Sequence, residues 1–142
     1  MVILFIDDDP DDTELFCEAL NYLNSSDLIA AEKEAIECLT ASNGRKAIEL
    51  LSSLSKLPDY IFLDVNMPVM GGKECLKYLK ANSLFSHVPV IMLSTALRPE
   101  DADEFLTLGA VECIRKPSGF TALVKVLSKF VYRKYGEMQS GC

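Results

Sequence analysis

Five side chains in this sequence stand where a predicted strand ends, and their types suit one chemistry. Asp7, Asp8, Asp64 and Ser94 end or follow apolar runs, and Lys116 follows the shorter, mixed segment 111–115. Carboxylates, a hydroxyl group and an ammonium group are what phosphoryl-transfer sites use to hold a cation and neutralise charge. Alone, Asp64 is more typical of a turn residue, and the combination is what indicates a site.

The three carboxylates predict a divalent-cation site. Carboxylates that share a cleft repel one another, which raises their pKa values, and a hard cation relieves this repulsion. Mg²⁺ is typically held by one or two carboxylates with further oxygens, and a backbone carbonyl near Asn66 could supply one of these. Asp64 would then be the nucleophile, as carboxylates are in aspartyl-phosphate chemistry.

Alternating strands and helices are needed to bring these residues together. The apolar runs predict strands near 2–6, 35–40, 60–64, 89–93 and 111–115, and helices follow them, the last one over 120–134. This alternation predicts an α/β fold, a doubly wound, five-stranded parallel sheet flanked by five helices. In the flavodoxin-like strand order 2-1-3-4-5, the carboxyl ends of strands one and three meet at the switch point.

The first helix explains part of the acidic segment after the first strand. Asp9 is a predicted N-cap and Pro10 the first helical residue, so Asp11 and Asp12 fall in the first turn, where the helix dipole favours negative charge. Its predicted buried residues are Leu15, Ala19, Leu20 and Leu23. Asp7 and Asp8 precede the cap, so the helix does not account for them.

Composition limits the function classes. The chain has 142 residues, of which 49% are hydrophobic and 25% charged, which fits one globular domain. A net charge of −7 disfavours direct DNA binding. No apolar run is long enough for a membrane span, and an acidic start without a basic segment favours the cytoplasm over secretion. Five cysteines with one histidine and no close Cys spacing predict reduced thiols, mostly packed in the core.

In these motifs the chain resembles the receiver domain of two-component response regulators, in particular the stand-alone type with the chemotaxis-regulator fold. The matching segments span roughly residues 2 to 132 and are Ile-Asp-Asp (6–8), Leu-Asp-Val-Asn-Met-Pro (63–68), Gly-Gly (71–72), Pro-Val-Ile-Met-Leu-Ser (89–94), Gly-Ala (109–110) and Lys-Pro (116–117). No single segment is specific, but the combination is.

The resemblance implies a role for each of the matching residues. Asp64 is expected to accept a phosphoryl group from a histidine kinase or a histidine phosphotransfer protein. Asp8 and Asp64, with the Asn66 backbone carbonyl, are expected to bind Mg²⁺, and Asp7 is expected to assist through water. The chain would participate in its own phosphorylation and dephosphorylation without being a turnover enzyme.

The resemblance also implies a switch, and here the sequence departs from the family. Ser94 and Lys116 are expected to contact the phosphoryl oxygens, with Ser94 closing on the phosphate. The family usually has Tyr or Phe three residues before the lysine, and that ring moves inward. In this chain the position is Cys113, so the aromatic half of the switch is in doubt.

The last residues of the chain predict which part of the protein would pass the signal to a partner. We expect residues 1–135 to form the receiver domain and residues 136–142 a short loose tail without an output domain. The output would then be a surface near the last two helices, for a protein target that the sequence does not identify. Lys125, Lys129 and Arg133 form a basic stripe on the last helix, which is usually a solvated face but could dock an acidic partner or a second copy as a homodimer.

Two other function classes compete with this interpretation. A haloacid-dehalogenase-like phosphatase could use Asp7 and Asp9 with Ser94 and Lys116, but Asp64 would then have no purpose. A non-phosphorylated flavodoxin-like binding module would share the fold. It lacks support because every phosphorylation residue is present and no phosphate-cradling loop follows the first strand.

Overall fold

Strands and helices alternate along the chain, as the apolar pattern predicts. The structure, a computed structural model, describes residues 1–25 and 35–140. Its elements are β1 (Val2–Ile6), α1 (Pro10–Asn24), β2 (Glu37–Ala41), α3 (Gly44–Ser53), β3 (Tyr60–Asp64), α4 (Gly72–Ala81), β4 (Val90–Ser94), α5 (Pro99–Thr107), β5 (Glu112–Arg115) and α6 (Phe120–Ser140).

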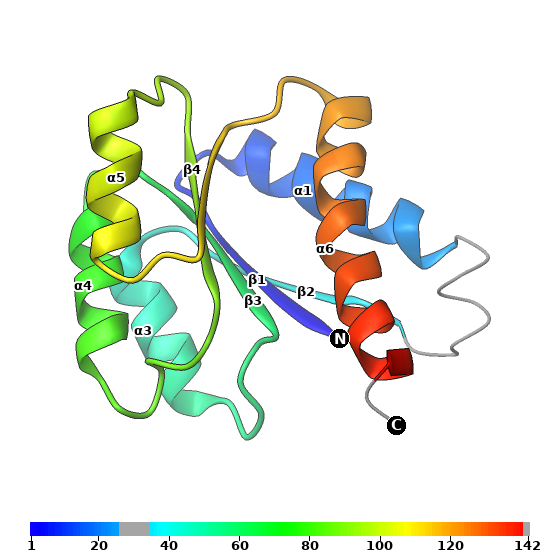
Figure 1. Ribbon diagram of the computed structural model, residues 1–142, viewed down its shortest axis with the longest axis horizontal. Helices are drawn as coiled ribbons and strands as arrows, with labels where there is room; N and C mark the ends of the chain where they lie inside the picture. The colour runs from blue at the N-terminus through cyan, green and yellow to red at the C-terminus, as the bar shows by residue number, and fades with distance from the viewer. Residues whose placement is uncertain (26–34, 141–142) are drawn as a thin grey trace.

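The five strands form one parallel sheet in the order β2-β1-β3-β4-β5. Helices α1 and α6 cover one face, and α3, α4 and α5 cover the other (Figure 1). This confirms the predicted doubly wound fold and its strand order. Because all strands run the same way, their carboxyl ends lie at one edge, and the order reverses between β1 and β3.

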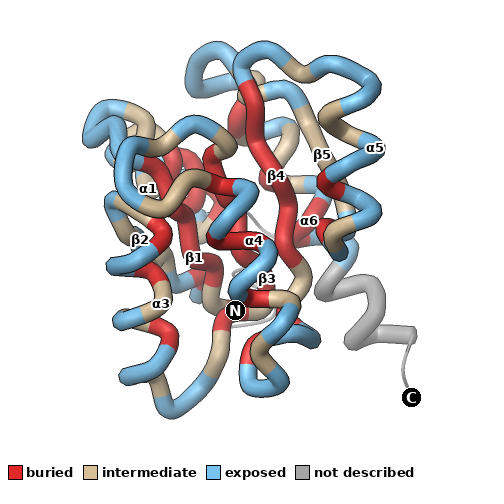
Figure 2. The backbone as a smooth tube through the Cα atoms, turned by 90° about the vertical axis from the view of Figure 1, so that its left-hand side faces the viewer, coloured by how far each residue is buried: buried red, intermediate tan, exposed pale blue. Residues whose placement is uncertain are grey.

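The strands are buried in the middle of the sheet and more exposed at its edges. Every residue of β3 and β4 is buried, and so is β1 after its first residue, whereas β2 and β5 have no buried residue (Figure 2). Strands that are covered on both faces need continuous apolar runs. This explains why β1, β3 and β4 are the clearest strand signals in the sequence.

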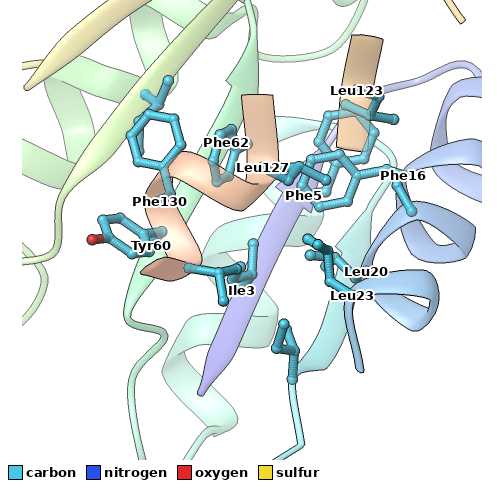
Figure 3. Close-up of a cluster of buried hydrophobic side chains, with 14 of the residues drawn as sticks. Ile3, Phe5, Phe16, Leu20, Leu23, Tyr60, Phe62, Leu123, Leu127 and Phe130 are labelled. Carbon is cyan, nitrogen blue, oxygen red and sulfur yellow. The ribbon is translucent and has the colours of Figure 1, made fainter. Parts of the chain in front are cut away.

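An aromatic cluster holds α1 and α6 on the sheet. Phe5 of β1 stacks on Phe16 of α1 with ring centroids 4.1 Å apart, and Phe130 of α6 packs edge-on against Phe62 of β3 at 5.2 Å (Figure 3). Aromatic pairs of this kind add about 0.5–1.5 kcal/mol beyond the area that they bury. They therefore set the position of α1 over β1, just below the carboxyl edge of the sheet.

Aliphatic side chains fill the opposite face. Leu4, Ile6, Ile61, Leu63, Val90 and Met92 of the strands pack against buried residues of the three helices, which are Ala47, Leu51, Cys75, Leu76, Leu79 and Phe105. Successive strand residues point to opposite faces, so neighbours such as Phe62 and Leu63 belong to different cores.

The first helix starts at its predicted capping residue, and α3 has a cap of the same kind. The Asp9 side chain accepts a hydrogen bond from the backbone N–H of Asp11, and Pro10 is the first residue of α1. Asn43 caps α3 in the same way, by accepting from the backbone N–H of Lys46. These caps satisfy N–H groups that would otherwise lack a partner at the helix end.

Three details differ from the prediction. Helix α6 continues to Ser140, so residues 136–140 are helical rather than a loose tail, because a single glycine costs only about 1 kcal/mol inside a helix. Phe16, and not Leu15, is fully buried on α1, since its ring fits against Phe5. Strand β2 begins at Glu37, later than expected. The predicted connection at 24–33 lies mostly outside the described residues.

Candidate functional site

The carboxylate of Asp7 is held in place just after β1 ends. Its backbone N–H donates to the carbonyl of Ala41, and its Oδ1 accepts from the backbone N–H of Asp9 at 2.9 Å. The residue is buried, whereas Asp8 beside it is exposed. The pair therefore presents one fixed, desolvated carboxylate and one that reaches solvent.

Asp64 is the last residue of β3 and is also buried. The next residue, Val65, donates its backbone N–H to the carbonyl of Leu93 at 3.0 Å, so β3 and β4 stay paired past the carboxylate. The backbone N–H of Asn66 donates to the Asp64 carboxylate. These contacts fix Asp64 at the carboxyl edge, beside the end of β4.

Gly72 lets α4 begin directly against the end of β3. A Cβ at this position would lie 2.7 Å from the Val65 Cα and would clash with the carbonyl oxygen of Asp64. The backbone N–H of Gly72 donates to the carbonyl of Val65 at 3.0 Å. A glycine at this position is therefore needed for the close packing of α4 against the end of β3, next to Asp64.

Lys116 brings a positive charge to the carboxylates at the ends of β1 and β3 and at the start of α1. Its Nζ lies 2.6 Å from Asp7 Oδ2, 2.7 Å from Asp12 Oδ2 and 3.7 Å from Asp64 Oδ1. Its backbone N–H donates to the carbonyl of Ser94 at 2.8 Å, which ties the segment after β5 to the end of β4. The lysine thus lies across the switch point between β1 and β3.

Burial and crowding shift the pKa values of these groups. Burial raises the pKa of Asp64 to about 6, with a further increase from Asp7 that Lys116 partly offsets. Burial likewise raises the pKa of Asp7, against hydrogen bonds from Lys116 and the Asp9 backbone. Burial lowers the pKa of Lys116, but hydrogen bonds to Asp12 and Asp7 outweigh it and raise that pKa overall. The site holds excess negative charge that one lysine does not balance.

The acidic cluster suits a hard divalent cation. Asp7, Asp8 and Asp64 each place a carboxylate oxygen within 4.8 Å of the others. Oxygen ligands from carboxylates are those that Mg²⁺ prefers. The donor set therefore fits the predicted metal, and a cation there would relieve the repulsion that raises the pKa of Asp64.

The other predicted residues, Ser94 and Cys113, lie on β4 and β5, on the far side of β3 from β1. Ser94 ends β4 and is buried, one residue beyond the strand partner of Asp64. Cys113 pairs with Met92 across the sheet and packs on the aliphatic core, and its burial raises the pKa of its thiol. The structure gives Cys113 a packing position, without the ring that the family usually has there.

Asp12 is a residue of the site that the sequence did not reveal. The sequence placed it in the first turn of α1 as a partner of the helix dipole. In the structure its carboxylate is the second-shortest contact of the Lys116 ammonium group. Only the placement of α1 over β1 brings a residue so far from Lys116 in the sequence beside it, so no local signal could have found it.

Residues 3–128 match the family described as "Response regulator receiver domain". The chain belongs to this family. The match covers most of the receiver domain's length and overturns the phosphatase alternative, for which Asp9 is also unsuited because its side chain caps α1. The same family match supports two-component signalling over the alternative of a non-phosphorylated binding module.

Two curated relatives are longer than this receiver domain. The CpxR homolog of Haemophilus influenzae, a transcriptional regulatory protein, is 35% identical over 133 residues, which are 92% of this chain and 50% of that protein. A protein-glutamate methylesterase/protein-glutamine glutaminase of Bacillus licheniformis is 45% identical over 83 residues, which are 56% of this chain and 22% of that protein. The receiver domain therefore spans half or less of these relatives.

Solved receiver structures match it over nearly their whole length. The chemotaxis protein CheY4 of Vibrio cholerae superposes with a TM-score of 0.73 at 29% identity, covering 90% of this chain and 96% of that one. The phosphorylated cyanobacterial phytochrome response regulator RcpA gives 0.76 at 25% identity, covering 91% and 89%. Among the residues that the structure describes here, no helix is both long and apolar enough to cross a membrane.

Proposed function

We propose that Asp64 is the phosphoacceptor of this receiver domain. The observation that carries this proposal is the position of Lys116. Its ammonium group is 3.7 Å from Asp64 Oδ1 and lies closer still to the carboxylates of Asp7 and Asp12. A buried carboxylate beside a cation and two more carboxylates suits acceptance of a phosphoryl group. The RcpA neighbour, which was solved in phosphorylated form, supports the same chemistry.

The transfer itself needs one nucleophile and charge neutralisation. A carboxylate oxygen of Asp64 attacks phosphorus, the bond from phosphorus to the donor nitrogen or oxygen breaks, and the leaving group keeps the electron pair. Lys116 is close enough to stabilise the charge on the phosphoryl oxygens. Ser94, which is buried at the end of the neighbouring strand β4, would donate its hydroxyl hydrogen to one of those oxygens.

We propose Asp7, Asp8 and Asp64, with the backbone carbonyl of Asn66, as the residues that would hold Mg²⁺. When bound, the cation supplies charge neutralisation for the acidic cluster and the phosphoryl oxygens. Asp7 is held by its hydrogen bond from the Asp9 backbone, whereas Asp8 is exposed to solvent. The buried and the exposed carboxylate would together set the metal position.

The donor and the route of the signal complete the proposal. A histidine kinase or histidine phosphotransfer protein would supply the phosphoryl group in the cytoplasm, and Asp64 would pass it to water without multiple turnover on an external substrate. Ser94 would close on the phosphate, and Cys113 would move within the aliphatic core in place of a ring. The surface at α5, β5 and α6 would then change for a downstream protein or a second copy.

Phosphorylation by a small donor tests the assignment. The chain is incubated with acetyl phosphate and Mg²⁺, and its intact mass is measured. We expect one added phosphoryl group on the parent and none on Asp64→Asn. We expect Asp8→Asn to need much more Mg²⁺ for the same labelling, because it removes a carboxylate ligand.

Asp11→Asn is the matched control, since it removes a nearby charge without touching the cluster. It should be labelled like the parent protein. Equal labelling of Asp64→Asn and the parent would disprove the acceptor assignment. Equal Mg²⁺ dependence of Asp8→Asn and the parent would disprove the metal assignment alone.

A further inference from the structure

Two cysteine side chains meet between α1 and β2, away from the strand ends. Cys17 lies on α1 and Cys38 is the second residue of β2. The Cys17 thiol is the hydrogen-bonding neighbour of the Cys38 thiol, and both cysteines are reduced and half-buried. Two thiols in direct contact are an arrangement that neither the fold nor phosphoryl transfer requires.

The sheet register explains why these two side chains meet. Cys38 pairs with Ile3 of β1, and both pack on the core beneath α1 and α6. Its neighbour Leu39 packs on the opposite core, as alternation along a strand demands. Cys38 therefore points toward the face of the sheet that α1 covers, and Cys17 of α1 is its neighbour there. Figure 1 shows α1 on this face of the sheet.

Only one of the two thiols is open to a cavity. A cavity of about 720 Å³ between α1 and the end of β2 is lined by Cys17 and Thr40, and also by Asp7 and Asp8. Cys38 does not line it. It lies two residues before Thr40, on the same face of β2. A small reagent in this cavity would therefore meet Cys17.

The environment of the two thiols assigns them different parts. Burial raises the pKa of Cys38, and the adjacent Cys17 raises it further, so Cys38 stays protonated. Because Cys17 faces the cavity, it is the thiol that a dissolved peroxide meets there. Cys38 is then in contact with whatever forms on Cys17.

We propose that Cys17 and Cys38 are a peroxide-oxidised dithiol that closes to a disulfide tying α1 to β2. The Cys17 thiolate attacks a peroxide oxygen, the O–O bond breaks, and the departing hydroxide takes up a proton to give water and a Cys17 sulfenic acid. The Cys38 sulfur then attacks the Cys17 sulfur, the S–O bond breaks, and the hydroxyl leaves as water with the Cys38 proton. Two thiols lose two electrons, and hydrogen peroxide is reduced to two waters.

This site is distinct from the other cysteines of the described chain. Cys75 is fully buried in the aliphatic core, and Cys113 lies on β5, on the far side of the sheet order from β2. Neither lines the cavity that holds Cys17. Among the cysteines that the structure describes, Cys17 and Cys38 are thus the pair that peroxide should link.

The experiment treats the full chain with hydrogen peroxide, blocks remaining thiols with N-ethylmaleimide and maps the peptides by mass. We expect the loss of two of the five thiols, a Cys17–Cys38 linked peptide, and full recovery with dithiothreitol. Cys38→Ala should abolish the link and leave a Cys17 sulfenic acid that dimedone traps. Cys113→Ala is the matched control and should form the link like the parent.

The parent protein alone decides the matter if a variant fails to fold. Five free thiols after peroxide treatment, or oxidation of Cys17 to sulfinic acid without a link, would overturn the proposal. So would a disulfide that joins other cysteines. Each result is independent of Asp64, because no phosphodonor or metal is present.

Discussion

At the scale of single residues, the central feature is one lysine shared among several carboxylates. Lys116 is closer to Asp7 and Asp12 than to Asp64. The proposed acceptor thus shares its cation with two competitors, one of them the partly exposed Asp12. Its reactivity depends on how firmly those competitors hold the ammonium group.

We predict that Asp12→Asn raises the rate of labelling by acetyl phosphate, because the Lys116 ammonium group is released toward Asp64. An ion pair of this exposure is worth up to about 1 kcal/mol, so the increase should be up to about fivefold. The rate is followed by intact mass. Asp11→Asn has the same change of charge and no contact with Lys116, so it should label at the parent rate. A rate for Asp12→Asn equal to or below that of the parent would contradict a restraining role.

The raised pKa of Asp64 predicts how stability depends on pH without metal. The folded pKa of about 6 lies above the ordinary value of 3.8, so the folded state binds more protons between these values. The contribution of Asp64 is therefore most favourable below the unfolded pKa and is lost as pH rises through the folded one. With a chelator present, Asp64→Asn should be more stable than the parent at neutral pH by on the order of 1–3 kcal/mol.

This difference should shrink as pH falls through 6 toward 3.8, since the parent carboxyl is then protonated as well. Urea unfolding at several pH values measures it. Asp103→Asn, which changes an exposed carboxylate on α5, should show no such pH dependence. A constant difference for Asp64→Asn across this range would contradict the raised pKa.

At the scale of elements, α4 packs closely against the end of β3, where the proposed acceptor Asp64 lies. Gly72 has no room for a side chain because Val65 and the Asp64 carbonyl are against it. A Cβ added at Gly71, one residue earlier, would have its nearest neighbour, the Met67 carbonyl oxygen, at 3.6 Å, and the φ of Gly71 is −60°. The two glycines therefore have unequal importance although they are adjacent.

We predict that Gly72→Ala lowers the free energy of unfolding by about 1–3 kcal/mol, because α4 must shift away from β3. Denaturant unfolding measures this change. Gly71→Ala is the matched control and should be neutral or slightly stabilising, since its backbone conformation suits alanine. Equal effects of the two substitutions would show that the contact at Gly72 does not constrain α4.

At the scale of the whole molecule, the last helix is tied to the centre of the sheet. Phe130 of α6 is 2% exposed and packs edge-on against Tyr60 and Phe62 of β3, the strand that ends in Asp64. Tyr132, two residues further, is 45% exposed. In the part of α6 whose side chains are described, Phe130 thus anchors the helix to the sheet, and the aromatic cluster in Figure 3 supports α6 and β3 together.

We predict that Phe130→Ala costs about 3–5 kcal/mol of stability, because it leaves a cavity between α6 and the sheet. Tyr132→Ala should stay within about 0.5 kcal/mol of the parent, as surface substitutions usually do. Thermal and urea unfolding of the two variants compare them directly. A small effect of Phe130→Ala would mean that α6 repacks without its ring.

The fold class and most of the proposed site could be predicted from the sequence, and the strand order followed once the flavodoxin-like arrangement was adopted. Buried parallel strands have continuous apolar runs, and residues that follow them must gather at one edge, so Asp7, Asp8, Asp64 and Lys116 could be grouped without coordinates. Local caps such as Asp9 were also predictable, because an N-cap needs only its own neighbours.

Tertiary structure decided the contacts between elements that are far apart in the chain. The Asp12 ion pair, the burial of Phe16 in preference to Leu15, and the meeting of Cys17 with Cys38 all depend on how α1 lies over β1 and β2. No periodicity encodes that angle and offset, because packing of side chains such as Phe5 on Phe16 sets them. The residues of the site could thus be predicted from the sequence, whereas the distribution of charge among them required the packed molecule.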